Sequence, residues 1–250
     1  MSSRPPRSSA PGQPVRLLKS GLRAGGLMLV GLMLAGLLVL IALRWVNPAI
    51  TPYFLASASQ QTRLTTTWLA LDDIPPHVAL AVVAAEDQRF PHHRGVDRAA
   101  LAEVLAQARR EGLSQVRGAS TITQQTVKNV VLWHGRDPVR KALELPLAMS
   151  VETLWGKPRI LELYLNVAEM GPALFGIEAA AQHHFGKPAQ HLTPREAALI
   201  AATLPNPKTR SAANPSAQVL ARAAWIQGQM SNLGPDWLAG IHPAIESDQR

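Results

Sequence analysis

Residues 84–95 read AAEDQRFPHHRG, and within this stretch two adjacent carboxylates, Glu86 and Asp87, follow a run of small apolar residues. Upstream, Val78 and Val82 recur at helical spacing, so the run predicts an apolar helix that ends at Glu86. The simplest interpretation of two neighbouring acids is a helix end that meets solvent. The alternative is an active-site carboxylate, and the rest of the chain has to decide between them.

Helix signals continue along the chain on both sides of this stretch. Residues 99–110 have a helical pattern, and capping patterns predict further helix starts at Thr121 with Gln124, at Asp137 before Pro138, and at Thr193 with Glu196. No alternating strand pattern exceeds four residues, so the sequence predicts a mainly α fold. Pro146 lies inside the helical segment 138–154, which predicts either a bend or a different helix boundary.

The amino-terminal part contains a membrane-spanning candidate. Residues 24–43, AGGLMLVGLMLAGLLVLIAL, are 20 residues without a charge, and a helix of that length spans about 30 Å, the thickness of the hydrocarbon core. A cleavable signal peptide is the alternative, but its apolar core is shorter, and the Ala-Ser-Ala at 56–58 lies far behind the span. Residues 1–23 carry five basic groups and no acid, which predicts a cytoplasmic amino terminus and an external remainder.

The charge of the chain is concentrated at this amino terminus. Residues 1–44 hold six basic groups and no acids, whereas the remaining residues hold 19 basic and 17 acidic groups, so bulk charge predicts no nucleic-acid partner. The absence of cysteine is compatible with an oxidising space outside the membrane. We expect a basic cytoplasmic tail at 1–23, a transmembrane helix at 24–43, an irregular connector at 44–73, a catalytic domain at 74–230 and a tail at 231–250.

Several motifs in series carry a family resemblance. The opening stretch resembles the first motif of the peptidoglycan glycosyltransferases, and it is carried here by Glu86, Asp87, Phe90, His93 and Gly95. Later motifs of the family are similar to RGASTITQQTVKN at 117–129, RKALE at 140–144, KPRILELYLN at 157–166 and the stretch 179–207. The chain has neither the Ser-x-x-Lys nor the Lys-Thr-Gly signature of the transpeptidase in bifunctional relatives, so it most resembles monofunctional members. The resemblance implies a lysozyme-like domain behind one transmembrane helix.

The resemblance also implies an activity, namely elongation of glycan strands from lipid II with release of undecaprenyl diphosphate. Glu86 matches the base that deprotonates the attacking sugar hydroxyl, as a positioned carboxylate can. Glu144 matches a second essential carboxylate, whose aim Pro146 leaves open. The residues implied to bind substrate are Lys128 and Arg136 at the diphosphate, Arg140 and Lys141 beside them, and Ser120, Thr121, Gln124 and Gln125 as hydrogen-bonding groups. Asp87 is expected to be structural, paired with a nearby arginine.

Taken singly, each of these groups has a simpler interpretation. The hydroxyl run at 120–123 could be only a cap, the basic residues could be an exposed face, and the histidine pairs lack metal-ligand spacing. No cofactor is required, although a divalent cation, Mg or Mn, is compatible with the family. Residues 97–116 match a membrane-touching lobe, and the apolar spacing of Leu101, Val104 and Leu105 fits membrane contact and core packing equally.

The predicted setting is the bacterial inner membrane, with the catalytic domain in the periplasm. Expected partners are lipid II, the nascent glycan strand, inner-membrane lipid and proteins of cell-wall synthesis or division. Two rival functions are a lytic enzyme with the same fold, which would have no diphosphate to hold, and a membrane scaffold without activity, for which Glu86 would be dispensable.

Overall fold

The computed structural model describes residues 13–58, 65–112, 120–133, 135 and 137–247, and these residues divide into two compact units. The first unit contains α1 (Gln13–Ala42). Its segment Leu22–Ala42 has a mean hydropathy of 2.5, and among the described residues it is the one helix long and apolar enough to cross a membrane. This segment is compatible with a single-pass membrane anchor, as residues 24–43 predict.

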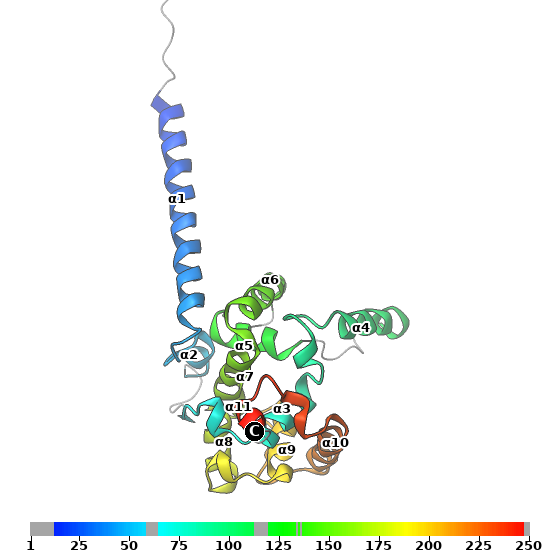
Figure 1. The fold of residues 1–250 in the computed structure, drawn as a ribbon. Coiled ribbons are helices and arrows are strands. Elements are labelled where there is room, and N and C mark those ends of the chain that lie inside the picture. The colour runs from blue at the N-terminus through cyan, green and yellow to red at the C-terminus, as the bar shows by residue number, and fades with distance from the viewer. Residues whose placement is uncertain (1–12, 59–64, 113–119, 134, 136, 248–250) are drawn as a thin grey trace, which may run out of the picture. The chain divides into compact units, whose positions relative to one another are not determined.

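The second unit, from Val46 onward, is mainly helical (Figure 1). Its α-helices are α2 (Pro52–Ala58), α3 (Pro76–Glu86), α4 (Arg98–Glu111), α5 (Ile122–Val130), α6 (Pro138–Leu154), α7 (Gly156–Val167), α8 (Ile177–Phe185), α9 (Pro194–Thr203), α10 (Ala217–Leu233) and α11 (Pro243–Ser247). Short 3₁₀ helices are η1 (Leu71–Asp73), η2 (Phe90–His92), η3 (Ala189–His191) and η4 (Pro235–Leu238). The predicted mainly α class is confirmed.

A small sheet completes this unit. Its strands are β1 (Thr65–Thr66), β2 (Glu169–Gly171) and β3 (Leu174–Phe175), in the order β1-β3-β2. β1 is parallel to β3, with Thr65 opposite Leu174, and β2 is antiparallel to β3. Strands this short lack the alternating pattern that would identify them in the sequence.

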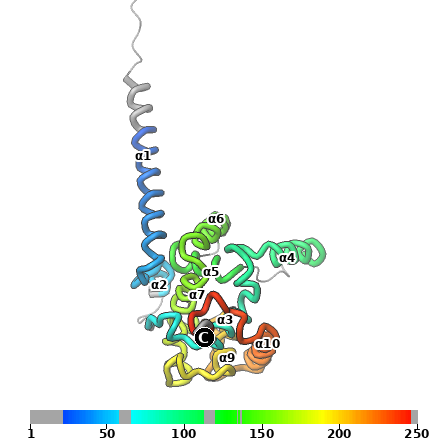
Figure 2. Tube along the Cα trace, viewed as in Figure 1, coloured from blue at the N-terminus to red at the C-terminus, as the bar shows by residue number. Residues whose placement is uncertain are grey.

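Helix α3 is the centre of the core. Its residues from Val78 to Ala84 are all buried, because α9 and α10 pack against it and also against each other (Figure 2). A helix that is apolar on every side is stable only when it is surrounded in this way. Since α3 ends at Glu86, that carboxylate extends from a helix that is buried in the core of the domain.

Helices α5, α6 and α7 pack together as a second group. Asp137 accepts hydrogen bonds from the backbone N–H groups of Val139 and Arg140 and so caps α6. Helix α6 continues through Pro146 to Leu154, so the predicted helix boundary is correct and the proline lies in the helix interior. Ser150 Oγ donates to Pro146 O at 2.9 Å.

Both ends of the domain extend beyond the predicted boundaries. The expected irregular connector 44–73 contains α2, whose Phe54 is buried with its ring centroid 4.6 Å from that of Phe175. The expected tail 231–250 begins inside α10 and includes the buried residues Leu238 and His242. Apolar and aromatic contacts with distant residues make these segments part of the fold, and local composition does not reveal such contacts.

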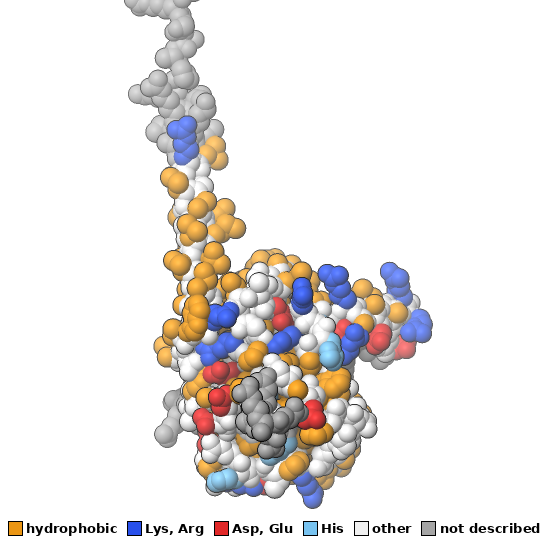
Figure 3. Space-filling model, in the orientation of Figure 1, with side chains coloured by type: hydrophobic (Ala, Val, Ile, Leu, Met, Phe, Trp, Pro, Cys, Tyr) orange, Lys and Arg blue, Asp and Glu red, His pale blue; other side chains and the backbone are white. Residues whose placement is uncertain are grey.

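Helix α4 extends away from this body, and none of its residues is buried (Figure 1). Leu101 and Leu105 are exposed, which excludes core packing as the reason for their spacing. Apolar side chains also gather on the surface over α6, and basic side chains lie along α4 (Figure 3). The exposed apolar residues of α6 include Val139 and Met149.

Candidate active site

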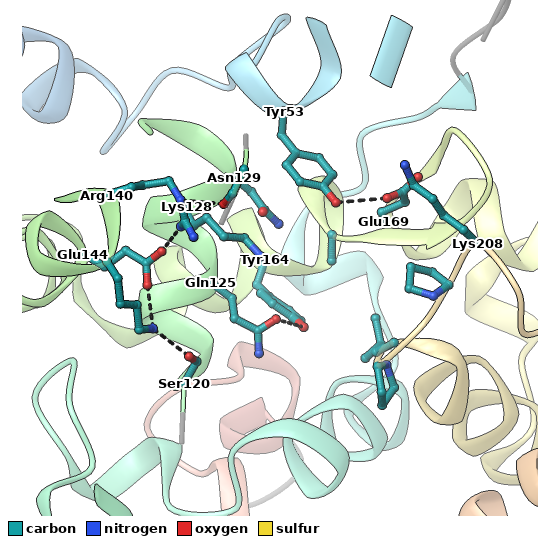
Figure 4. Close-up of a pocket in the computed structure, with 16 residues that line it drawn as sticks. Tyr53, Ser120, Gln125, Lys128, Asn129, Arg140, Glu144, Tyr164, Glu169 and Lys208 are labelled. Carbon is teal, nitrogen blue, oxygen red and sulfur yellow. Dashed lines mark hydrogen bonds and ion pairs between the residues drawn. The ribbon is translucent and has the colours of Figure 1, made fainter. Parts of the chain in front are cut away.

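A cleft of about 680 Å³ opens between the α5–α7 group and the loop that follows α9 (Figure 4). Its lining residues are Tyr53, Ser120, Gln125, Lys128, Asn129, Gly135, Arg140, Lys141, Glu144, Tyr164, Ala168, Glu169, Leu204, Pro205, Pro207 and Lys208. A second cavity of about 270 Å³ is lined by Ala84, Ala85, Glu86, Asp87, Gln88, Arg89, Asp97, Ala100, Ser120 and Thr121. Ser120 lines both cavities, so they are adjacent.

Glu86 lies between the two cavities. It lines the smaller one, and its Oε2 accepts a hydrogen bond of 2.8 Å from Nε2 of Gln125, which lines the larger one. Burial raises the pKa of Glu86, although the Gln125 hydrogen bond and the charges of Arg222 and Lys128 act in the opposite direction. A carboxylate with a raised pKa and a fixed direction is suited to accept a proton near neutral pH.

Asp87 has a different environment from its neighbour. It is buried, His93 Nε2 lies 3.0 and 2.9 Å from its two carboxylate oxygens, and Ile122 N donates to its Oδ2 at 2.9 Å. The expected arginine partner is therefore wrong: Asp87 pairs with a histidine and with a backbone N–H at the start of α5. Asp87 joins the end of α3 to α5 and leaves Glu86 as the carboxylate beside the cleft.

The other residues of the first motif are structural as well. Phe90 is fully buried, and Lys157 Nζ lies 4.2 Å from the centroid of its ring. Gly95 has φ +83°, and a Cβ added there would lie 2.6 Å from Ala148 O of α6. Glycine is required at this position because the loop backbone touches a helix backbone in a left-handed conformation.

The first turn of α5 is held by Thr121 and Gln124, two residues that the sequence predicted to bind substrate. Thr121 Oγ1 accepts from Gln124 N and donates to Gly95 O, while Gln124 Oε1 accepts from Thr121 N. Both side chains are buried. The predicted capping box is confirmed, and it engages these groups within the protein. Thr121 also lines the smaller cavity, and the contact of Thr121 and Gln124 with substrate stays a prediction. Ser120 and Gln125 do line the cleft, as predicted.

Basic side chains from α5 and α6 meet in the cleft around one carboxylate. Glu144 is buried, and its two oxygens accept hydrogen bonds from Arg140 Nη1 and, at 2.7 Å, from Lys141 Nζ. Lys141 Nζ also donates to Ser120 Oγ at 2.8 Å, and Arg140 Nε donates to Gly135 O at 2.9 Å (Figure 4). Arg140 and Lys141 precede Glu144 by four and three residues on the same helix, so their side chains meet, and the direction of Glu144 that Pro146 left open is toward these cations.

Lys128 differs from the other cations of the cleft. Within the described part of the chain it makes no ion pair, and its ammonium lies 5.8 Å from the centroid of the Tyr53 ring. Burial is the main cause that lowers its pKa, with Glu144 acting in the opposite direction. A half-buried ammonium without a carboxylate partner is available to an anionic ligand. Arg136, the other residue predicted at the diphosphate, lies outside the described residues.

The described residues of the cleft do not form a ligand set for a metal held by the protein alone. The described residues include no group of three or more His, Cys, Asp or Glu side chains that could hold an ion. Both oxygens of Glu144 already contact cations.

Other residues of the cleft are not in the predicted set. Tyr164 is buried and its hydroxyl donates to Gln125 Oε1 at 3.2 Å, while Tyr53 donates to Glu169 Oε2 at 3.0 Å. Asn129 Oδ1 is buried without a hydrogen-bond partner among the described residues. Tyr164 and Asn129 lie within the motifs 157–166 and 117–129, which could have identified them, whereas no local signal marks Tyr53.

Comparison with known proteins gives consistent matches. A family model described as Transglycosylase matches residues 54–231. The chain is 48% identical over 204 residues to a biosynthetic peptidoglycan transglycosylase of Marinomonas sp. (strain MWYL1), which covers 82% of this chain and 88% of the relative. It is 52% identical over 171 residues to a protein of the same name from Mannheimia succiniciproducens (68% and 69%), and 54% identical over 167 residues to one from Shigella boydii (67% and 69%).

Proposed function

The chain belongs to the transglycosylase family, and we propose that it polymerises peptidoglycan glycan strands from lipid II with Glu86 as the general base. The domain is the lysozyme-like transglycosylase domain, and the chain is a peptidoglycan glycosyltransferase whose substrates are lipid II and the glycan strand. The roles of individual residues are argued below from their positions in the cleft.

The reaction joins a sugar hydroxyl to an anomeric carbon that carries a diphosphate. In the proposed mechanism Glu86 accepts the proton of the acceptor 4-hydroxyl as that oxygen attacks C1 of the donor sugar, with inversion. The C1–O bond to the diphosphate breaks in the same step, and the electron pair leaves with the diphosphate. The raised pKa of Glu86 and its hydrogen bond to Gln125 support this role, because the base must have sufficient affinity for the proton and must be oriented toward the sugar hydroxyl.

The leaving diphosphate is stabilised by cations that balance its negative charge, and it does not depend on protonation by an acid. Lys128 would bind it directly, with Arg140 and Lys141 beside it, in a cleft partly shielded from water. Glu144 contacts both Arg140 and Lys141, so it would act as a positioning residue that holds these cations toward the cleft. Arg136 is proposed at the same diphosphate from the motif match.

The single observation that carries the proposal is Lys128, a half-buried ammonium without an ion-pair partner among the described residues, in a cleft that reaches Glu86 through Gln125. A lytic enzyme that cleaves finished glycan has no diphosphate for this cation to bind. A scaffold without activity would have no need for the buried carboxylate of Glu86 beside this cleft.

The test is a gel of the products formed from purified lipid II by the parent protein and by Glu86→Gln. Glutamine keeps the size and hydrogen bonding of the side chain but removes proton acceptance, so we expect a loss of about 10²–10⁴-fold in turnover. Binding of lipid II should persist, because the diphosphate contacts are unchanged. Glycan made at the parent rate by Glu86→Gln, or release of fragments from finished glycan by the parent, would contradict the proposal.

The membrane setting is also proposed. The five basic residues within positions 1–23 support a cytoplasmic amino terminus in the inner membrane and a periplasmic domain. The exposed leucines of α4, Leu101 and Leu105, together with Arg109 and Arg110, support contact of that helix with inner-membrane lipid. Proteins of cell-wall synthesis or division remain proposed partners.

A reporter fused after Arg250 tests this orientation. Alkaline phosphatase should be active there because it matures only outside the cytoplasm, and a cytoplasmic reporter at the same position should be silent. Activity of the cytoplasmic reporter would refute the orientation.

A further inference from the structure

Helix α10 brings a cation to the end of α3 from a distant part of the chain. Arg222 Nη2 donates a hydrogen bond of 2.9 Å to the carbonyl oxygen of Ala85, the residue that precedes Glu86. Helices α3 and α10 pack against each other (Figures 1 and 2). Arg222 lies outside the motifs on which the family resemblance rests.

The contact completes the last turn of α3. The final carbonyl groups of a helix have no partners within the helix and need other donors. Here Val83 O accepts from Asp87 N at 2.9 Å, Ala84 O accepts from Gln88 Nε2 at 3.2 Å, and Ala85 O accepts from Arg222. A cation at a helix carboxy terminus also interacts favourably with the helix dipole. The guanidinium therefore fixes the backbone from which the Glu86 side chain extends.

Arg222 is itself held in place. Its guanidinium carbon lies 3.9 Å from the centroid of the Trp225 ring, one turn further along α10. Stacking of a planar guanidinium on an aromatic face restricts its orientation and leaves its edge free to donate hydrogen bonds. A lysine could supply the charge but not this geometry.

The charged and titratable groups around Glu86 come from several elements. Asp87 follows it directly, α5 contributes Lys128, α7 contributes the buried hydroxyl of Tyr164, and α10 contributes Arg222. Gln125 adds a neutral hydrogen bond, and Arg210 lies near enough to Arg222 to influence it. Arg222 and Lys128 are the two cations that favour the ionised carboxylate of Glu86 against its burial. Lys128 is in the cleft where we propose the diphosphate, whereas Arg222 approaches from the side of α10.

We propose that Arg222 is a positioning residue for the base: it fixes the last turn of α3 through Ala85 O and balances the charge of the Glu86 carboxylate. When a diphosphate occupies the cleft, it engages Lys128, and Arg222 is then the remaining cation that favours ionised Glu86. The inference rests on the proposed role of Glu86 as the base.

The test is the pH dependence of kcat/KM for lipid II, measured with the full chain in detergent micelles. Arg222→Gln keeps a hydrogen-bond donor but removes the charge, and one charge about 8–12 Å away changes a pKa by about 1–1.5 units at an effective dielectric constant near 20. We expect the acidic limb of the profile to move to higher pH by that amount. We expect kcat at neutral pH to fall between about tenfold and 100-fold, the range for a misplaced catalytic group, with KM within about twofold.

Further variants separate charge from geometry and from folding. Arg222→Lys should keep the acidic limb within about 0.3 pH unit of the parent but still lose part of kcat, because charge is kept and the stacked geometry is lost. Arg195→Gln, at an exposed arginine of α9, is the matched control and should leave both the profile and the melting temperature unchanged. If Arg222→Gln does not fold, Trp225→Leu is the second test: it frees the guanidinium from its platform but keeps the charge, so kcat should fall while the acidic limb stays within about 0.3 pH unit of the parent, and an unchanged kcat would overturn the positioning role.

An acidic limb of Arg222→Gln that coincides with that of the parent would overturn the positioning role, even if the variant is less stable. Failure of the proposed function is recognised separately. If Glu86→Gln makes glycan at the parent rate, Glu86 is not the base. If Glu86→Gln is inactive and the Arg222→Gln profile is unshifted, only the role of Arg222 is wrong.

Discussion

Replacing Asp87 by asparagine should unfold the domain at a lower temperature without removing the chemistry. Asp87 is buried, and its oxygens accept hydrogen bonds from His93 Nε2 and from Ile122 N. An asparagine amide has one oxygen to accept these bonds, and its NH₂ group would face one of the donors. The variant therefore loses one charge-assisted hydrogen bond and weakens another.

The size of the effect follows from these contacts. Hydrogen bonds to charged groups contribute about 1.5–3 kcal/mol each. Losing one of these bonds and weakening the other therefore lowers the free energy of unfolding by about 3 kcal/mol. For a domain of this size each kcal/mol lowers the melting temperature by about 2–4 °C, which gives a decrease of roughly 6–12 °C. His93 cannot compensate easily, because its Nδ1 is already buried without a partner among the described residues.

The assay is a thermal melt followed by circular dichroism, together with lipid II turnover well below the melting temperature. We expect Asp87→Asn to melt early but to polymerise within about tenfold of the parent rate, whereas Glu86→Gln should fold normally and lose about 10²–10⁴-fold. Asp73→Asn, at an exposed acid of η1, is the control and should change stability by less than about 0.5 kcal/mol. An Asp87→Asn protein that melts with the parent yet makes no glycan would refute the reasoning.

Two further substitutions test the cleft and its support. Lys128→Ala should lower turnover by about 10²–10³-fold, as removal of one electrostatic contact does. Its melting temperature should change little, because this ammonium has no ion pair among the described residues. Retained turnover would contradict the proposed role of Lys128. Gly95→Ala should lower the free energy of unfolding by at least about 2 kcal/mol in a denaturant titration, because the new Cβ meets Ala148 O in a left-handed backbone conformation. Gly228→Ala is its control: it has open space inside α10 and should stabilise by about 0.5–1 kcal/mol, so equal effects of the two would refute the steric argument.

Local patterns predict the parts of the fold that depend on neighbours in sequence. The capping boxes at Thr121 and Thr193, the end of α3 at Glu86 and the long apolar helix were all predictable, because each depends on residues within a few positions. The motif order then identified the cations that meet at Glu144. A pattern repeated over several positions carries such information without any knowledge of the tertiary structure.

Roles that depend on distant contacts were not predictable. Tyr53 lines the cleft only because α2 packs beside α5, and the carboxyl-terminal residues are buried only because they return to η1 and α3. The same limit explains the partner of Asp87: the nearby arginine, Arg89, lies 3.6 Å from Asp97 instead. Which of several adjacent polar groups faces a cleft is decided by the fold and not by the motif.

The position of Glu144 explains why a site for an anion contains a buried carboxylate. Burial is the main cause that lowers the pKa of Lys128, and the two α6 cations, Arg140 and Lys141, are close enough to lower it further. Glu144 acts to raise that pKa and hydrogen-bonds both α6 cations, so it favours the charged forms and fixes their direction before any ligand arrives. Among the described residues, three cations and one carboxylate leave two positive charges against the two negative charges of a bound diphosphate diester. Arg136, proposed at the same diphosphate, would add a cation for the negative charge that develops as the C1–O bond breaks. In the proposed mechanism such a cluster would stabilise the departing diphosphate without reorganisation, and this preorganisation is the condition under which electrostatic groups accelerate a reaction most.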